Sequence, residues 1–259
     1  MLILYSTVHL LKNLSRQEAI RLGMAVYWDG TWRTTSTGKP CFFVGTNDVD
    51  QRFHAAAGGI IDSENTGQCT TVLDTVFDLI NVIRDREDEN AGNSPRPDLE
   101  ADWVVADNSD ALQAAAESKG AVPVNCKAHL IRNAKDAAGI TSTATMERKE
   151  AVKDVQKDLC RISTNTLFAG VSVEDHVGSI ADVLPVLFAQ KHEADQPDYI
   201  KKFKKEYMGD RKGTWQAAHT NPGIAVHNNG VEKFNESFKT DGTRPFNFAS
   251  LVWALVLQS

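Results

Sequence analysis

Residues 24–61, MAVYWDGTWRTTSTGKPCFFVGTNDVDQRFHAAAGGII, decide the fold class of this 259-residue chain. Apolar and aromatic runs at Met24–Trp32, Pro40–Thr46 and Gln51–Ile61 have the composition of β-strands. They are separated by Ser-Thr-Gly-Lys and Asn-Asp-Val-Asp, which are sequences that favour tight turns. Because connections this short join antiparallel neighbours, the stretch predicts a three-stranded meander.

Downstream of the meander, helix and strand patterns alternate. Val72, Val76 and Ile80 recur at helical spacing and predict a helix over 71–83, with Asn65 upstream as a capping residue. Further strand and helix patterns then follow one another, which predicts parallel strands with helical crossovers. These four segments are Asp102–Ala106, Asn108–Lys119, Ala121–Asn125 and Lys127–Ala138.

The remaining segments contain a loop pattern and several helix patterns. The charged stretch 84–100 carries Pro95 and Pro97 and predicts an exposed loop. From 144 to 207 the pattern is helical, without a convincing strand. We therefore predict an N-terminal helical lead-in (1–23), a first part of the core (24–143), a helical insertion (144–225), and a catalytic helix with an apolar C-terminal helix that complete the core (226–259).

This order of elements resembles a ribonuclease H-like core. The expected fold is α/β, with a ribonuclease H-like mixed sheet made of a three-strand meander plus a strand-helix-strand unit. A helical insertion precedes the last catalytic helix. In mixed sheets of this kind, charged functional residues gather at the carboxyl ends of strands, where loops and helix starts converge.

Composition limits the classes of function. No apolar run approaches the roughly 20 residues that a membrane-spanning helix needs. The net charge of −6 and the isoelectric point near 5.7 give no global footprint for nucleic acid. Any contact with DNA must therefore come from local sites. Four cysteines without regular spacing argue against a disulfide scaffold and favour a reducing compartment.

Two aspartates lie at predicted strand ends. Asp29 lies where the first strand meets Gly30, and Asp107 follows the fourth strand directly. Adjacent strand ends would bring the carboxylates together, and two like charges need a cation to neutralise them. Mg²⁺ prefers oxygen ligands, and two such ions about 3.5–4 Å apart can promote phosphoryl transfer. Taken singly, an aspartate at a strand end is more often a turn or capping residue than a catalytic one, and only the joint arrangement favours catalysis.

A third carboxylate is predicted in HNNGVEKFNESFK, residues 227–239. Phe234 and Phe238 share one helical face, while Glu232 lies on another face and would point to the edge of the sheet. Glu236, one turn further on, is an alternative ligand. A surface glutamate without a catalytic role is the other interpretation of Glu232.

Three blocks of the sequence resemble, in the same order, the catalytic blocks of Mutator-like element (MuDR-type) transposases. They are Tyr27–Asn65, Trp103–Lys135 and 227–239, so that the resemblance extends over roughly Met24–Lys239. It implies a DDE triad of Asp29, Asp107 and Glu232. Eukaryotic members are similar in having a helical insertion before the glutamate, which fits the 125 residues from Asp107 to Glu232.

The resemblance also implies an activity and partners. The activity is metal-dependent DNA cleavage and strand transfer, with Mg²⁺ or Mn²⁺ in a two-metal site bound by the triad. The partner is DNA, the compartment is the nucleus, and a homo-oligomer is left open. The alternatives are a non-catalytic or domesticated DNA-binding remnant of the same fold and a structure-specific nuclease. Residues near the site would be Cys126, His129, Asn229, Asn235 and Lys239.

Two smaller features have competing interpretations. Cys126 and His129 are spaced like two metal ligands, but a closed zinc site needs four, so a buried thiol beside a helix start is the alternative. One basic cluster predicts contact with DNA phosphates, since local positive charge drives backbone binding, although a solvated helix face is an equal alternative. Its members are Lys201, Lys202, Lys204, Lys205, Arg211 and Lys212.

Overall fold

The computed structural model describes residues 2–18, 23–31, 38–48, 50, 52–107, 109–137, 145–164, 179–208, 214–217, 220, 227 and 229–230. The chain divides into two compact units. The sheet unit consists of Met1–Pro123 with Asn228–Ser259, and the helical unit consists of Val124–His227. In the part of the chain that is described, no helix combines the length and apolarity needed to cross a membrane.

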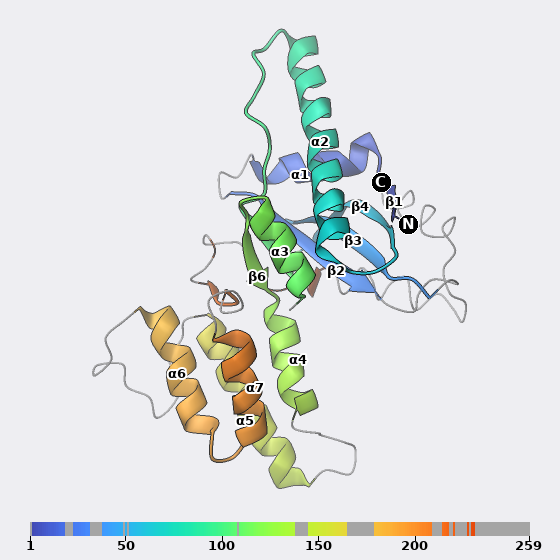
Figure 1. The fold of residues 1–259 in the computed structure, drawn as a ribbon. Coiled ribbons are helices and arrows are strands. Elements are labelled where there is room, and N and C mark those ends of the chain that lie inside the picture. The colour runs from blue at the N-terminus through green and yellow to red at the C-terminus, as the bar shows by residue number, and fades with distance from the viewer. Residues whose placement is uncertain are drawn as a thin grey trace. The chain divides into compact units, whose positions relative to one another are not determined.

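A six-stranded mixed sheet forms the centre of the α/β fold, with strand order β1-β4-β3-β2-β5-β6 (Figure 1). Strands β2, β3 and β4 are antiparallel neighbours, as the short turns predict. Strand β1 also pairs antiparallel with β4, while β2 and β5 are parallel. The strands are β1 (Leu2–Tyr5), β2 (Ala25–Thr31), β3 (Cys41–Asn47), β4 (Phe53–Ile61), β5 (Trp103–Ala106) and β6 (Val122–Asn125).

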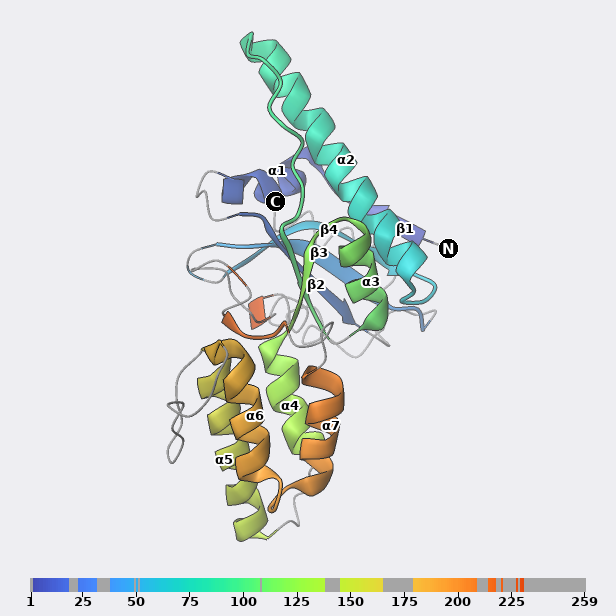
Figure 2. The ribbon, with the colours of Figure 1, turned by 60° about the vertical axis from the view of Figure 1, so that its left-hand side comes forward.

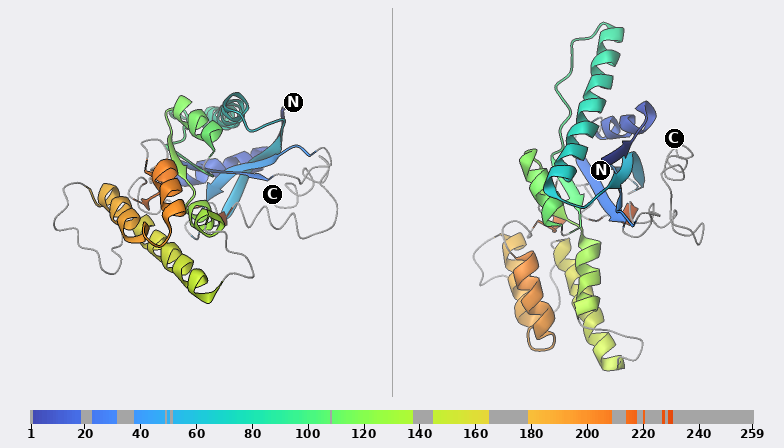
Figure 3. Two further views of the ribbon diagram at one scale, coloured as in Figure 1. Left: turned by 60° about the horizontal axis from the view of Figure 1, so that its bottom comes forward. Right: turned by 45° about the vertical axis from the view of Figure 1, so that its right-hand side comes forward.

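Helices α1 (Val8–Glu18), α2 (Thr66–Ala91) and α3 (Asp110–Ser118) belong to the sheet unit. Figures 2 and 3 show α2 and α3 on the same side of the sheet. Alternate residues of β2, including Trp28, face the main apolar core together with Val72 and Val76 of α2. Trp28 stacks on Phe42 with ring centroids 5.0 Å apart. This burial is the main force that fixes α2 against the sheet.

Helix α2 corrects the predicted exposed loop at 84–100, because it continues to Ala91. Its charged end is rich in Arg and Glu, which have good helix propensity, and the helix ends at Gly92 in the left-handed conformation with φ 71°. The returning segment packs along the helix. Arg84 donates to the carbonyl of Pro97 at 3.1 Å, and Arg96 donates to Asp88 at 2.9 Å.

The predicted helical lead-in (1–23) begins instead with a strand. β1 pairs antiparallel with β4, with Leu2 opposite Ile61 and Leu4 opposite Gly59. The approach is so close that a Cβ at Gly59 would overlap the carbonyl oxygen of Ile3. The four-residue run alone was too short to distinguish strand from helix, and the open edge of β4 decides its conformation.

The helical unit contains α4 (Lys127–Ala137), α5 (Met146–Ser163), α6 (Ile180–His192) and α7 (Pro197–Tyr207), which lie side by side in Figure 2. The described residues between 145 and 208 form helices and no strand. Leu130 of α4 shares an apolar core with Leu159, Phe188, Phe203 and Trp215. Because α4 joins this core, the unit begins at Val124, earlier than the predicted boundary at 144.

Candidate active site

Asp29 lies in β2, and Asp107 directly follows β5, the parallel neighbour of β2. Ala25 of β2 pairs with Trp103 of β5, and Tyr27 pairs with Val105. Continued by two residues, this register would place Asp29 opposite Asp107. Neighbouring strands run about 4.8 Å apart, so we expect the two aspartates near each other at the carboxyl ends of these strands. Asp29 is 8% exposed.

Glu64 is a third acidic residue at this edge, and the sequence analysis did not single it out. It lies between β4 and α2, directly before the capping residue Asn65. A Cβ placed on Gly30, the residue after Asp29, would be 3.4 Å from Glu64 Oε2. The Glu64 carboxylate therefore lies close to Gly30, near the end of β2.

The negative charge of Glu64 affects the pKa of the Asp107 carboxyl. Burial and, to a smaller extent, the negative charge of Glu64 raise the pKa of the Asp107 carboxyl to about 6, against a lowering by the hydrogen bond with the Ser109 backbone N–H. Cys69, in the first turns of α2, responds to the same charges. Its pKa is raised to about 12 by burial, and then by Glu64 and Asp107. The three side chains thus share one poorly solvated region.

One oxygen of each of these two carboxyl groups is buried without a hydrogen-bond donor. Asp107 Oδ1 and Glu64 Oε1 each expose less than 1 Å² and have no partner. Burying a carboxylate oxygen without a donor or a counter-charge is costly, and native proteins leave few such atoms. The described residues provide no hydrogen-bond donor for these two oxygens, so a bound ligand is needed to account for their burial.

Mg²⁺ and Mn²⁺ fit this pair of orphaned oxygens. Both ions favour carboxylate ligands, and Mg²⁺ is commonly held by one or two carboxylates, with waters and substrate phosphates completing its shell. Across the described residues, no group of three or more His, Cys, Asp or Glu side chains is arranged to hold a metal ion. The fit accordingly rests on Asp107 and Glu64, with Asp29 beside them in the sheet register.

Several predicted site residues lie outside the described residues. These are Glu232, its alternative Glu236, Asn235, Lys239, Arg211 and Lys212. Asn229 is described and is exposed. The role of Glu232 as third member of the triad thus stays a prediction. Glu64 is the described acidic residue whose charge acts on Asp107.

Cys126 and His129 belong to the helical unit. Cys126 is 1% exposed and directly precedes α4, and His129 lies in the first turn of that helix. All four cysteines are described, and none forms a disulfide. The burial of Cys126 agrees with the simpler of its two interpretations, a thiol packed beside a helix start.

The described lysines of the basic cluster form the solvent face of α7. Lys201, Lys202, Lys204 and Lys205 are exposed, whereas Tyr199, Phe203 and Tyr207 on the opposite face are buried. Lys204 is paired with Glu193 at 2.7 Å. The amphipathic pattern accounts for these positions by itself, so contact with DNA remains a prediction.

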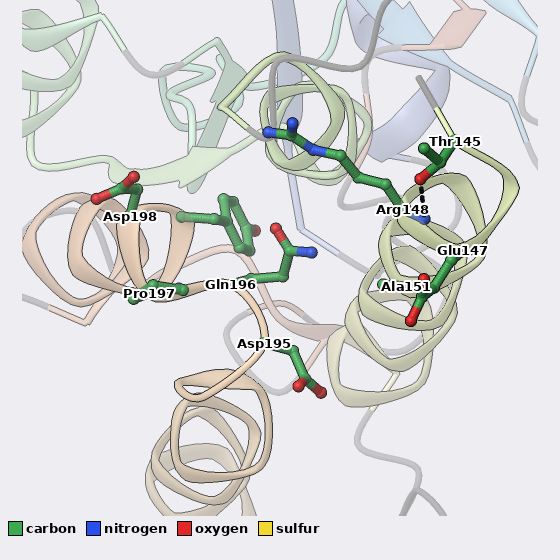
Figure 4. Close-up of a pocket in the computed structure, with 9 residues that line it drawn as sticks. Thr145, Glu147, Arg148, Ala151, Asp195, Gln196, Pro197 and Asp198 are labelled. Atoms are coloured by element: carbon green, nitrogen blue, oxygen red, sulfur yellow. Dashed lines mark hydrogen bonds between the residues drawn. The ribbon is translucent and has the colours of Figure 1, made fainter. Parts of the chain in front are cut away.

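A polar hollow of about 400 Å³ lies elsewhere in the helical unit (Figure 4). Its lining includes Glu147, Arg148, Asp195 and Asp198, from α5, α7 and the turn before α7. Thr145 caps α5 there by accepting a hydrogen bond from the Arg148 backbone N–H at 3.3 Å. Three carboxylates against one guanidinium make this hollow unsuitable for a DNA phosphate.

The chain matches no protein-family model and no curated protein.

Proposed function

We propose that this chain is a DDE-type transposase catalytic domain with a ribonuclease H-like sheet unit, similar to Mutator-like element transposases. It would cleave DNA and join the freed 3′-hydroxyl to a target strand, with Mg²⁺ or Mn²⁺ as cofactor. The observation that carries the proposal is the parallel pairing of β2, which contains Asp29, with β5, which Asp107 directly follows, together with a buried Asp107 oxygen that has no hydrogen-bond partner.

The topology supports the proposal. An antiparallel meander of β2, β3 and β4 is followed by α2 and by the parallel strand β5, with β6 at the edge. This is the order expected of a ribonuclease H-like core. Both aspartates then fall at carboxyl ends of strands, where open sheets place their ligands.

The chemistry follows from the positions of the carboxyl groups. Asp29 is held within β2 by its pairing with β3, opposite Phe43, so its position varies little. Asp107, whose carboxyl pKa is raised, must release its proton to act as a ligand. When bound, a divalent cation would activate the attacking oxygen and stabilise the leaving oxygen of the phosphodiester. The two aspartates would help to hold that cation, because carboxylates bind divalent cations and repel a phosphate.

The test uses supercoiled plasmid DNA and a labelled oligonucleotide with a free 3′-hydroxyl, in Mg²⁺ or Mn²⁺. We expect nicking of the plasmid and joining of the oligonucleotide to it. Asp29→Asn and Asp107→Asn should abolish both, while Asp98→Asn, which makes the same change at an exposed position, should retain them. Nicking without joining would favour the structure-specific nuclease. The absence of both nicking and joining would contradict the proposal and would favour a non-catalytic DNA-binding protein.

A further inference from the structure

We infer that Glu64 is a ligand of the divalent cation, so that Glu64 and Asp107 together form the cation site at the edge of the sheet beside Asp29. The inference rests on the proposed function for the presence of a cation. It adds a residue that the triad from the sequence does not contain. It also places the site within the described part of the sheet unit, without requiring Glu232.

The backbone of Glu64 is held in place. Asn65, the next residue, accepts a hydrogen bond from the Gln68 backbone N–H at 3.0 Å and so caps α2. The Asn65 N–H in turn donates to the Ser63 carbonyl at 3.0 Å. Glu64 therefore extends from a fixed turn, and its carboxylate lies near the end of β2, where a Cβ on Gly30 would be 3.4 Å from Glu64 Oε2.

A proton shared between the two carboxyl groups is the main alternative to a cation. In that case a hydrogen bond would join Glu64 to Asp107. None does so in the described structure, and Glu64 Oε1 and Asp107 Oδ1 have no partner at all. A cation accounts for both orphaned oxygens and for the repulsion between the two charges, because each oxygen supplies a lone pair to it.

The same geometry gives the consequence of losing Glu64. Glu64→Gln keeps the shape of the side chain but removes one negative charge. It also replaces a carboxylate by an amide, which is a weaker ligand for a divalent cation. Of the two carboxylates of the site, only that of Asp107 would then face the cation. A single ligand commonly contributes tenfold or more in metal affinity, as second-shell partners do when they are removed.

The experiment titrates the metal-free chain with MnCl₂. Calorimetry measures the affinity for Mn²⁺, and thermal unfolding measures the change in stability. We expect the unmodified chain to bind Mn²⁺ and to gain thermal stability through mass action. Glu64→Gln should weaken Mn²⁺ binding by about tenfold or more. Glu64→Asp, which keeps the charge but shortens the side chain, should fall between the two. Glu89→Gln, an exposed position on the same helix, should bind like the unmodified chain.

Equal Mn²⁺ affinity in Glu64→Gln and in the unmodified chain would overturn the inference, as would an unmodified chain that binds no Mn²⁺. Circular dichroism of Glu64→Gln shows whether that variant is folded, and Glu64→Asp keeps the test decisive if it is not. The two proposals can fail separately. Glu64-dependent Mn²⁺ binding without DNA nicking would refute the transposase activity alone. Nicking that depends on Asp107 but not on Glu64 would refute the role of Glu64 alone.

Discussion

Replacing Asp107 by Asn should stabilise the metal-free protein at neutral pH. The pKa of this carboxyl rises from 3.8 to about 6 on folding. Since one pKa unit corresponds to about 1.4 kcal/mol, a difference of about 2 makes the ionised carboxyl cost up to about 3 kcal/mol. Asp107 retains some solvent exposure, so a gain of about 2 kcal/mol for the amide is the better expectation.

The sign of the pH dependence follows from the same shift. A carboxyl whose pKa is higher in the folded state binds its proton more tightly there, so the penalty is absent below about pH 4. The penalty grows as the pH rises towards 6 and is constant above it. The advantage of Asp107→Asn should therefore be largest at pH 7–8 and disappear as the pH falls towards 4.

Urea unfolding in EDTA, followed by circular dichroism between pH 4 and 8, measures this difference. Adding Mg²⁺ at pH 7.5 should stabilise the unmodified chain and leave Asp107→Asn almost unchanged, which closes or reverses the gap. Asp98→Asn provides the control for an exposed carboxylate. A variant that is no more stable than the unmodified chain at pH 7.5, or a difference that does not vary with pH, would refute the reasoning.

Two further outcomes test other parts of the structure. Gly59→Ala should destabilise the sheet unit by 2 kcal/mol or more, on the order of an overpacked core site, because its Cβ would overlap the Ile3 carbonyl oxygen; a shift below 0.5 kcal/mol in urea unfolding would contradict the close β1–β4 pairing. Replacing the α7 lysines by Ala should weaken DNA binding about equally for all sequences and reduce its salt dependence, measured by fluorescence anisotropy at several salt concentrations. An unchanged affinity for DNA would show that these lysines only form a solvated helix face. The residues replaced together are Lys201, Lys202, Lys204 and Lys205.

Much of the α/β fold follows from local patterns. The three early apolar runs and their turns predict β2, β3 and β4 to within two residues of their observed ends. The extension of α2 to Ala91 could not be predicted in this way, because a fully charged stretch next to prolines resembles a loop. Its helical state depends on contacts with the returning segment, such as Arg84 with Pro97, and these are tertiary.

The candidate site divides in the same way. Asp29 and Asp107 could be found from the sequence because each follows an apolar run, and the parallel pairing of β2 with β5 makes the strands that carry them neighbours. Glu64 has no comparable signal, since a glutamate before a helix cap is commonplace. Its position near Gly30 and Asp107 depends on the course of the chain from β4 to α2.

A buried polar atom without a partner is not by itself a sign of function. Thr46 Oγ1 and the Tyr199 hydroxyl are also buried without partners, yet both are neutral, and an unsatisfied hydroxyl is tolerated more cheaply than a charge. Glu64 and Asp107 differ because they are two acids whose fields overlap, as the raised pKa values of both Asp107 and Cys69 indicate. Packing gains nothing from this arrangement, since an apolar pair would fill the same space at lower cost. A ligand that binds the charged form recovers the cost, and a divalent cation is the ligand that two carboxylates select.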